Sequence, residues 1–207
     1  LRFGRLYGYL TTSEMKVEDL MKIFEWNRDA QTEFQRIPSF STKTLIPKIL
    51  DWVPNHTSWD AVWLKQHPEF YTRYKGNLTT PINEHGEPIT DWSDICDLDY
   101  NQPGTRKAMI DAMKYWITSA DIDGFRVDMA GLVPNDFWAE ARPALDSVKQ
   151  MFMLAEWQDE PGHFNSCFNA NYGWKWKDIT KDIATGKQNA TSLDTLLNYL
   201  DEFYPKD

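Results

Sequence analysis

The chain has 207 residues and a mass of 24.3 kDa, and its 22 Lys and Arg against 31 Asp and Glu give a net charge of -9. Such an acidic chain lacks the basic surface that a phosphate backbone requires, so the composition argues against a nucleic-acid partner. It contains no run of 18 or more apolar residues, so we expect no membrane span, and residues 1–5 do not form a signal peptide. The localisation stays unknown, with secreted and periplasmic locations both open.

Three apolar runs predict strands. Residues 45–53 form the first run, which ends in polar side chains, residues 122–128 form the second, and residues 151–155 form the third. The third run is apolar throughout, which is typical of a strand covered on both faces.

Three helices are predicted after these strands. The first begins at Pro103 and places Met109, Ala112, Met113, Trp116 and Ile117 on one buried face. The second covers residues 135–149, where Pro143 should kink or shorten it, and the third begins at Ser192. The alternation of strands and helices predicts right-handed βαβ crossovers and therefore an α/β fold with a parallel sheet, either open or closed into a barrel.

Each predicted strand ends at or near a carboxylate: Asp51, Asp128 or Glu156. The carboxyl ends of parallel strands form the site in both architectures. Arg126 shares a strand face with Asp128 and favours its ionised form, whereas Glu156 lies between an apolar strand and Trp157, which favours its protonated form. Two such carboxyl groups are the minimum apparatus for glycoside cleavage. The alternative at this point is a set of solvated strand-end caps with a structural Arg–Asp pair.

Three short strings carry a family resemblance. Residues 51–56 read D-W-V-P-N-H, residues 124–130 read G-F-R-V-D-M-A, and residues 154–157 read L-A-E-W. In this order they resemble the first three signatures of the α-amylase family, glycoside hydrolase family 13. Residues 97–99, D-L-D, are similar to a further short motif of that family. The resemblance covers about residues 46–207, points to the bacterial maltooligosaccharide-active type, and leaves residues 1–44 poorly matched.

The resemblance implies a (β/α)8 TIM barrel that is incomplete in this chain, since a whole barrel takes roughly 250 residues. Residues 1–56 would be the N-terminal part of the barrel, residues 57–97 a domain B-like insertion after the third strand, and residues 98–207 the continuation up to the seventh strand. An open barrel exposes strand edges and apolar surface. We therefore expect the remainder of the same polypeptide, or a partner chain, to cover it. The insertion holds five candidate sugar platforms, Trp59, Trp63, Tyr71, Tyr74 and Trp92.

The resemblance also implies roles. Asp128 corresponds to the nucleophile and Glu156 to the general acid/base of a retaining glycosidase that cleaves α-1,4-glucosidic bonds in starch-type or maltooligosaccharide substrates. The other positions that match are substrate-binding His56, Arg126 and Trp157 and structural Asp51.

Many α-amylases hold a Ca²⁺ ion between domain B and the barrel. Asn55 and Asp97 correspond to two of its ligands, so the resemblance includes a Ca²⁺ site at these residues. Gly131 and Leu132 replace a Lys-His pair that the family has after Ala130. Because Ca²⁺ takes six to eight oxygen ligands, the sequence supplies only part of the set.

The fourth family signature, a His-Asp pair at the end of the seventh strand, is not found up to Asp207. Losing its charge-stabilising Asp is expected to weaken or abolish activity of the chain as given. One alternative is therefore a non-catalytic or truncated glucan-binding fragment. Another is a transglycosylase or cyclomaltodextrinase of the same family, since water and a sugar hydroxyl differ only as acceptors.

Overall fold

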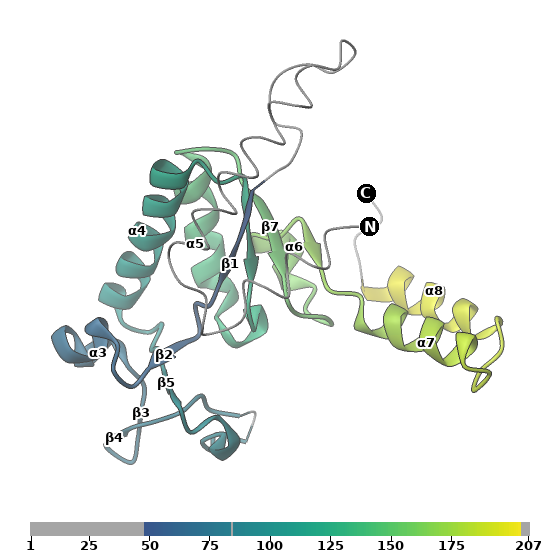
Figure 1. Cartoon of the computed structure of the whole chain (residues 1–207), viewed down its shortest axis with the longest axis horizontal. Helices are drawn as coiled ribbons and strands as arrows, with labels where there is room; N and C mark the ends of the chain where they lie inside the picture. The colour runs from purple at the N-terminus through teal and green to yellow at the C-terminus, as the bar shows by residue number, and fades with distance from the viewer. Residues whose placement is uncertain (1–47, 84, 204–207) are drawn as a thin grey trace, which may run out of the picture. The chain divides into compact units, whose positions relative to one another are not determined.

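The structure, a computed structural model, describes residues 48–83 and 85–203 (Figure 1). The start of the first predicted strand, at residues 45–47, and most of the predicted N-terminal part of the barrel lie outside the described residues. In the part that is described, no helix combines the length and hydrophobicity needed to cross a bilayer.

A four-stranded parallel sheet is the centre of the fold. Its strands run in the order β1 (Ile49–Trp52), β6 (Gly124–Val127), β7 (Phe152–Ala155) and β8 (Ala170–Asn171). Strands that follow one another along the chain are also neighbours in the sheet, and helices connect them (Figure 1). This is the arrangement of a (β/α)8 barrel, of which these strands form part. The three predicted strands are confirmed in the described residues, whereas β8 was not predicted.

Five α-helices accompany the sheet strands. They are α4 (Pro103–Ala120), α5 (Asn135–Asp146), α6 (Gly162–Ser166), α7 (Trp174–Ala184) and α8 (Ser192–Phe203). The predicted starts of α4, α5 and α8 are confirmed, and α6 and α7 were missed. Helix α5 continues through Pro143 and ends at Asp146 instead of residue 149. Trp116 of α4 is 39% exposed, so its predicted place on the buried face is wrong. The buried residues of this helix are Thr105, Met109, Ile110, Met113 and Ile117.

The two faces of the sheet differ in burial. On one face Phe125, Val127 and Met153 are fully buried, and they belong to the same core cluster as residues of α4 and α5. On the other face Ile49 is 36% and Phe152 is 43% exposed. The prediction that the third strand is covered on both faces is therefore wrong for the described residues. Four strands make only part of a barrel, and the interior of a barrel is filled by side chains from all of its strands.

The segment between β1 and α4 forms small paired elements of its own. Its strands are β2 (His56–Ser58) paired with β5 (Ile95–Asp97) and β3 (Arg73–Tyr74) paired with β4 (Asn77–Leu78), and its helices are α3 (Val62–Gln66), η1 (Pro68–Phe70) and η2 (Thr90–Trp92). It corresponds to the predicted insertion, whose limits at residues 57–97 stay a prediction. Of the candidate sugar platforms, Tyr71 is a core residue with 2% exposure, and Trp63 packs edge-on against Phe70.

Candidate active site

Polar side chains meet where the sheet strands end. Asp51 of β1 is the register partner of Arg126 of β6, so the two side chains leave the same face of the sheet. The Asp128 N–H donates to the Trp52 carbonyl of β1 at 2.8 Å, and the Glu156 N–H donates to the Val127 carbonyl of β6 at 2.9 Å. The parallel hydrogen-bond ladder therefore continues one residue beyond the ends of β6 and β7. Three neighbouring strands thereby bring the predicted Asp51, Arg126, Asp128 and Glu156 to the carboxyl edge of the sheet.

Arg126 lies at the centre of this group. Its Nη1 donates to Asp51 at 2.8 Å and to Asp128 at 2.7 Å. Its Nη2 forms an ion pair of 2.5 Å with Glu156. Its Nε donates to the hydroxyl of Tyr172 at 3.1 Å. The predicted pairing of Arg126 with Asp128 is thus observed, while the contacts with Glu156 and Tyr172 were not predicted.

Burial makes these charges interact strongly. The Arg126 side chain is 9% exposed, and those of Asp128 and Glu156 are 25% and 20% exposed. Burial by itself lowers the pKa of Arg126, but hydrogen bonds to Tyr172, Asp128 and Asp51 reverse this and raise the pKa. The guanidinium therefore stays charged at every pH at which the protein is folded.

Glu156 has the opposite balance. Its burial and a hydrogen bond with Asp128 raise the pKa of Glu156, while Arg126 and the Met129 N–H lower it, and the net direction is upward. A raised pKa favours the protonated form of a carboxyl group, which is the form that a general acid needs. Nη1 and Nη2 of the one Arg126 guanidinium bind Asp128 and Glu156 respectively, so the two carboxyl groups lie side by side.

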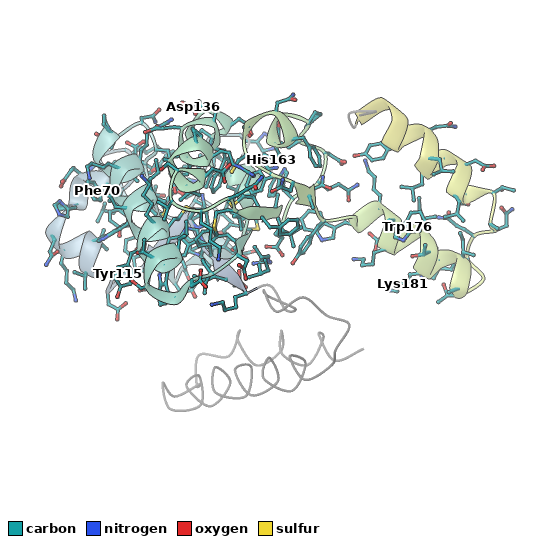
Figure 2. The ribbon with its side chains drawn as sticks, turned by 90° about the horizontal axis from the view of Figure 1, so that it is seen from above. Phe70, Tyr115, Asp136, His163, Trp176 and Lys181 are labelled. Carbon is teal, nitrogen blue, oxygen red and sulfur yellow. The ribbon has the colours of Figure 1, made fainter. Side chains whose placement is uncertain are left out.

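The turn after β6 is strained and tightly held. Met129 adopts a left-handed conformation with φ 46° and ψ 42°, which a residue with a Cβ adopts rarely. The Met129 N–H donates to Glu156 Oε2 at 3.4 Å. The next carbonyl, of Ala130, accepts from Trp138 Nε1 at 3.2 Å. His163 of α6, labelled in Figure 2, is 1% exposed and packs against the Phe168 ring, with centroids 4.7 Å apart.

Trp157 packs on a glycine. A Cβ at Gly131 would lie 2.0 Å from the Trp157 ring, so the indole occupies the space that any side chain there would need. The ring also meets Trp174 edge-on, with centroids 6.5 Å apart. This close approach leaves no room for a side chain at position 131, so it accounts for the glycine there. The role of Trp157 in substrate binding stays a prediction.

His56 lies near Asp128, and the neighbouring Asn55 contacts Asp97. His56 Nδ1 is 3.3 Å from Asn55 Oδ1. Burial lowers the pKa of His56, and the charges of Asp128 and Asp94 oppose that shift. Asn55 Nδ2 donates to Asp97 Oδ1 at 3.4 Å, and both residues are buried. The structure therefore places the side chains of Asn55 and Asp97 in contact with each other, while their role as metal ligands stays a prediction.

These residues fit only part of a Ca²⁺ site. Asn55 turns its amide nitrogen, not its oxygen, toward Asp97, and its oxygen faces the His56 ring. Among residues 48–83 and 85–203 no group of three or more His, Cys, Asp or Glu side chains is placed to hold a metal ion. Since Ca²⁺ takes six to eight oxygens, the two side chains supply a minority of the ligands.

Comparison with known proteins gives consistent relatives. Residues 17–182 match the model of the α-amylase catalytic domain. A cyclomaltodextrinase of Geobacillus thermopakistaniensis is 36% identical over 108 residues, which is 50% of this chain and 18% of that protein. An intracellular maltogenic amylase of Bacillus subtilis is 33% identical over 81 residues, which is 35% of this chain and 14% of that protein.

Solved structures agree with these relatives. The noncanonic maltogenic α-amylase AmyB from Thermotoga neapolitana is 34% identical and superposes with a TM-score of 0.66 over 78% of this chain and 36% of that one. An α-amylase from Lactobacillus plantarum is 31% identical with a TM-score of 0.65 over 76% of this chain and 39% of that one. The chain thus spans less than two fifths of these solved relatives. Because the catalytic-domain match covers most of its residues, the chain belongs to the α-amylase family.

Proposed function

We propose that this chain carries the catalytic carboxyl pair of a retaining glycoside hydrolase that cleaves α-1,4-glucosidic bonds in starch-type or maltooligosaccharide substrates. The observation that carries the proposal is the arrangement of Asp128 and Glu156, which bind the two Nη atoms of the one Arg126 guanidinium at the carboxyl edge of the sheet. A close pair of carboxyl groups with different environments is what double displacement requires.

In the first step the Asp128 carboxylate attacks the anomeric carbon, and the bond from that carbon to the glycosidic oxygen breaks. The proton held by Glu156 goes to the departing oxygen, so the leaving sugar departs as a neutral alcohol. Arg126 supports this step because a buried guanidinium at 2.7 Å stabilises the charged form of Asp128.

In the second step the ionised Glu156 takes a proton from water. The resulting hydroxide attacks the anomeric carbon, the ester bond to Asp128 breaks, and both carboxyl groups return to their initial protonation states. Two inversions at one carbon give net retention. A sugar hydroxyl in place of water would give transfer to a second sugar by the same atoms.

The substrate class follows from the relatives. Their names describe maltogenic amylases and cyclomaltodextrinases, and a cyclomaltodextrin glucanotransferase from Geobacillus stearothermophilus is 25% identical over 145 residues. Hydrolysis and transfer are therefore both represented among proteins similar to this chain. We include transfer as the second candidate function.

We also propose that the sheet is completed by the remainder of the same polypeptide or by a partner chain. The support is the exposure of Ile49 and Phe152 on the sheet face that carries Asp51 and Arg126. The predicted Ca²⁺ site at Asn55 and Asp97 likewise stays a prediction, and no step above depends on it.

The test is product analysis on maltopentaose. Shorter maltooligosaccharides that appear first as the α-anomer by proton NMR support the proposal, and products longer than the substrate support transfer. Release of the β-anomer contradicts a retaining mechanism. Calorimetric binding of maltopentaose without any product would support the glucan-binding alternative instead.

A further inference from the structure

The Arg126 guanidinium is a rigid planar fork, so fixing the direction of one N–H fixes the directions of the others. Its two Nη atoms face the carboxylates, with Nη1 bonded to Asp128 and Nη2 to Glu156. The third direction, Nε–H, ends on the hydroxyl of Tyr172 at 3.1 Å. Whatever holds Tyr172 therefore determines how the guanidinium is divided between the two carboxyl groups.

Tyr172 is held by the same backbone that carries Glu156. Its N–H donates to the carbonyl of Ala155 at 3.1 Å and to that of Trp157 at 3.2 Å, the residues on either side of Glu156. Its ring meets Trp174 edge-on at 5.9 Å and 87°, and the Arg126 guanidinium carbon lies 5.6 Å from the ring centroid. The hydroxyl is thus fixed relative to the Glu156 backbone by two hydrogen bonds and an aromatic contact.

We propose that Tyr172 is a positioning residue, which holds the Arg126 guanidinium so that one of its nitrogens stays against Glu156. The inference rests on the proposed function of Asp128 and Glu156. Tyr172 follows β8 and is assigned to no signature of the family resemblance. It acts through Arg126 and contacts no reacting atom.

The consequence concerns the proton on Glu156. Arg126 lowers the pKa of Glu156, against burial and Asp128, which raise it. Without the Tyr172 hydroxyl, the guanidinium turns toward Asp51 and Asp128, the two carboxylates bonded to Nη1. The ion pair between Nη2 and Glu156 is then weaker. The pKa of Glu156 then rises further. The charged and titratable groups that face this cluster are Asp51, His56, Arg126, Asp128 and Tyr172.

The test is a carboxyl-¹³C NMR titration of the full chain labelled at glutamate, with the Glu156 signal assigned through Glu156→Gln. Tyr172→Phe removes the hydroxyl and keeps the ring. Tyr115→Phe is the matched control, because Tyr115 is 62% exposed on α4 (Figure 2). We expect Tyr172→Phe to raise the Glu156 midpoint by about 0.5 pH unit or more and Tyr115→Phe to leave it unchanged.

The kinetic readout uses maltopentaose. We expect Tyr172→Phe to lower kcat/KM by about tenfold with KM within about threefold, and to move the basic limb of the pH profile upward with the Glu156 midpoint. Trp174→Leu loosens Tyr172 but keeps its hydroxyl, so it should raise the Glu156 midpoint by a smaller amount. This variant tests the proposal if Tyr172→Phe does not fold.

An unchanged Glu156 midpoint in both variants overturns the proposal, as does an equal shift in Tyr115→Phe. If the parent chain cleaves maltopentaose while the midpoints do not move, the positioning role alone is refuted. If the parent chain does not cleave it, the proposed function fails in this chain, and the NMR titration still decides whether Tyr172 controls Glu156 through Arg126.

Discussion

Glu156 and Arg126 form an ion pair of 2.5 Å between neighbouring strands. The same guanidinium holds Asp128 at 2.7 Å, so one buried cation serves both members of the proposed catalytic pair. Its attraction opposes protonation of Glu156, while burial and Asp128 favour it. The pKa of Glu156, the acid of the proposed mechanism, is therefore raised by burial and Asp128 and lowered by Arg126, with a net upward direction.

Replacing Asp128 with Asn removes the proposed nucleophile and keeps the shape of the side chain. We expect turnover of maltopentaose to fall by about 10³-fold or more, which corresponds to ~4 kcal/mol of lost transition-state stabilisation. The rate of reducing-end release measures it. An Asp94→Asn variant, which changes a nearby exposed carboxylate, is the control and should retain most of the activity. Full activity of Asp128→Asn would refute the assignment.

Glu156 should produce the basic limb of the pH profile. The acid must be protonated, and its pKa is raised above 4.5, so activity is lost as the pH rises through that raised value. Glu156→Ala should lower maltopentaose turnover by about 10²–10⁴-fold and remove the basic limb. With α-maltosyl fluoride, whose leaving group needs no proton, the first step should be nearly preserved. An equal loss on both substrates would count against the role of acid.

Arg126→Lys should destabilise the fold as well as the site. A lysine is a single point charge and cannot bond to Asp51, Asp128 and Glu156 together. We expect the free energy of unfolding to fall by about 2–4 kcal/mol, since unpaired buried carboxylates are costly. Urea unfolding measures it. Lys107→Ala, which breaks an exposed ion pair with Asp111 on α4, should change it by less than ~0.5 kcal/mol. Equal effects would contradict the buried network.

His163 should make the fold sensitive to acid. Burial lowers the pKa of His163 below 6.5, and the charge of Glu160 only partly offsets this. Between that lowered value and 6.5 the unfolded chain binds a proton that the folded chain does not, so stability falls as the pH decreases below 6.5. His163→Gln cannot take up this proton. The loss of thermal stability between pH 7.5 and pH 5.5 should therefore be smaller in the variant, and an equal loss would show that other groups dominate.

Calcium should stabilise the chain if Asn55 and Asp97 belong to a Ca²⁺ site. After treatment with a chelator, adding Ca²⁺ should raise the thermal midpoint more than adding Mg²⁺, because bound ligand stabilises the folded state alone. Asn55→Ala should abolish the increment. No increment in the parent chain would show that these two side chains do not hold the ion.

Sequence patterns predicted the elements with strong local signals. The apolar runs of β6 and β7 and the amphipathic pattern of α4 were sufficient, whereas β8 has only two residues and α6 only five. Helix α7 was missed although Trp176, Ile179 and Ile183 recur at helical spacing, and none of its residues is buried in the described part of the chain.

The site was predictable as far as its residues are neighbours along a strand or parts of a motif. Arg126 and Asp128 are two positions apart, and their contact follows from strand geometry. The contacts of Arg126 with Glu156 and Tyr172 depend on how three strands are aligned, which no local pattern encodes. The strained turn at Met129 could not be predicted from the sequence either, because the surrounding structure imposes it and no glycine marks the position.

The packing of Trp157 on Gly131 makes the side chains that these two positions can hold depend on each other. Any side chain introduced at 131 collides with the indole, and a smaller side chain at 157 leaves an unfilled hole above the glycine. Each single replacement is therefore unfavourable, while the two together are compatible.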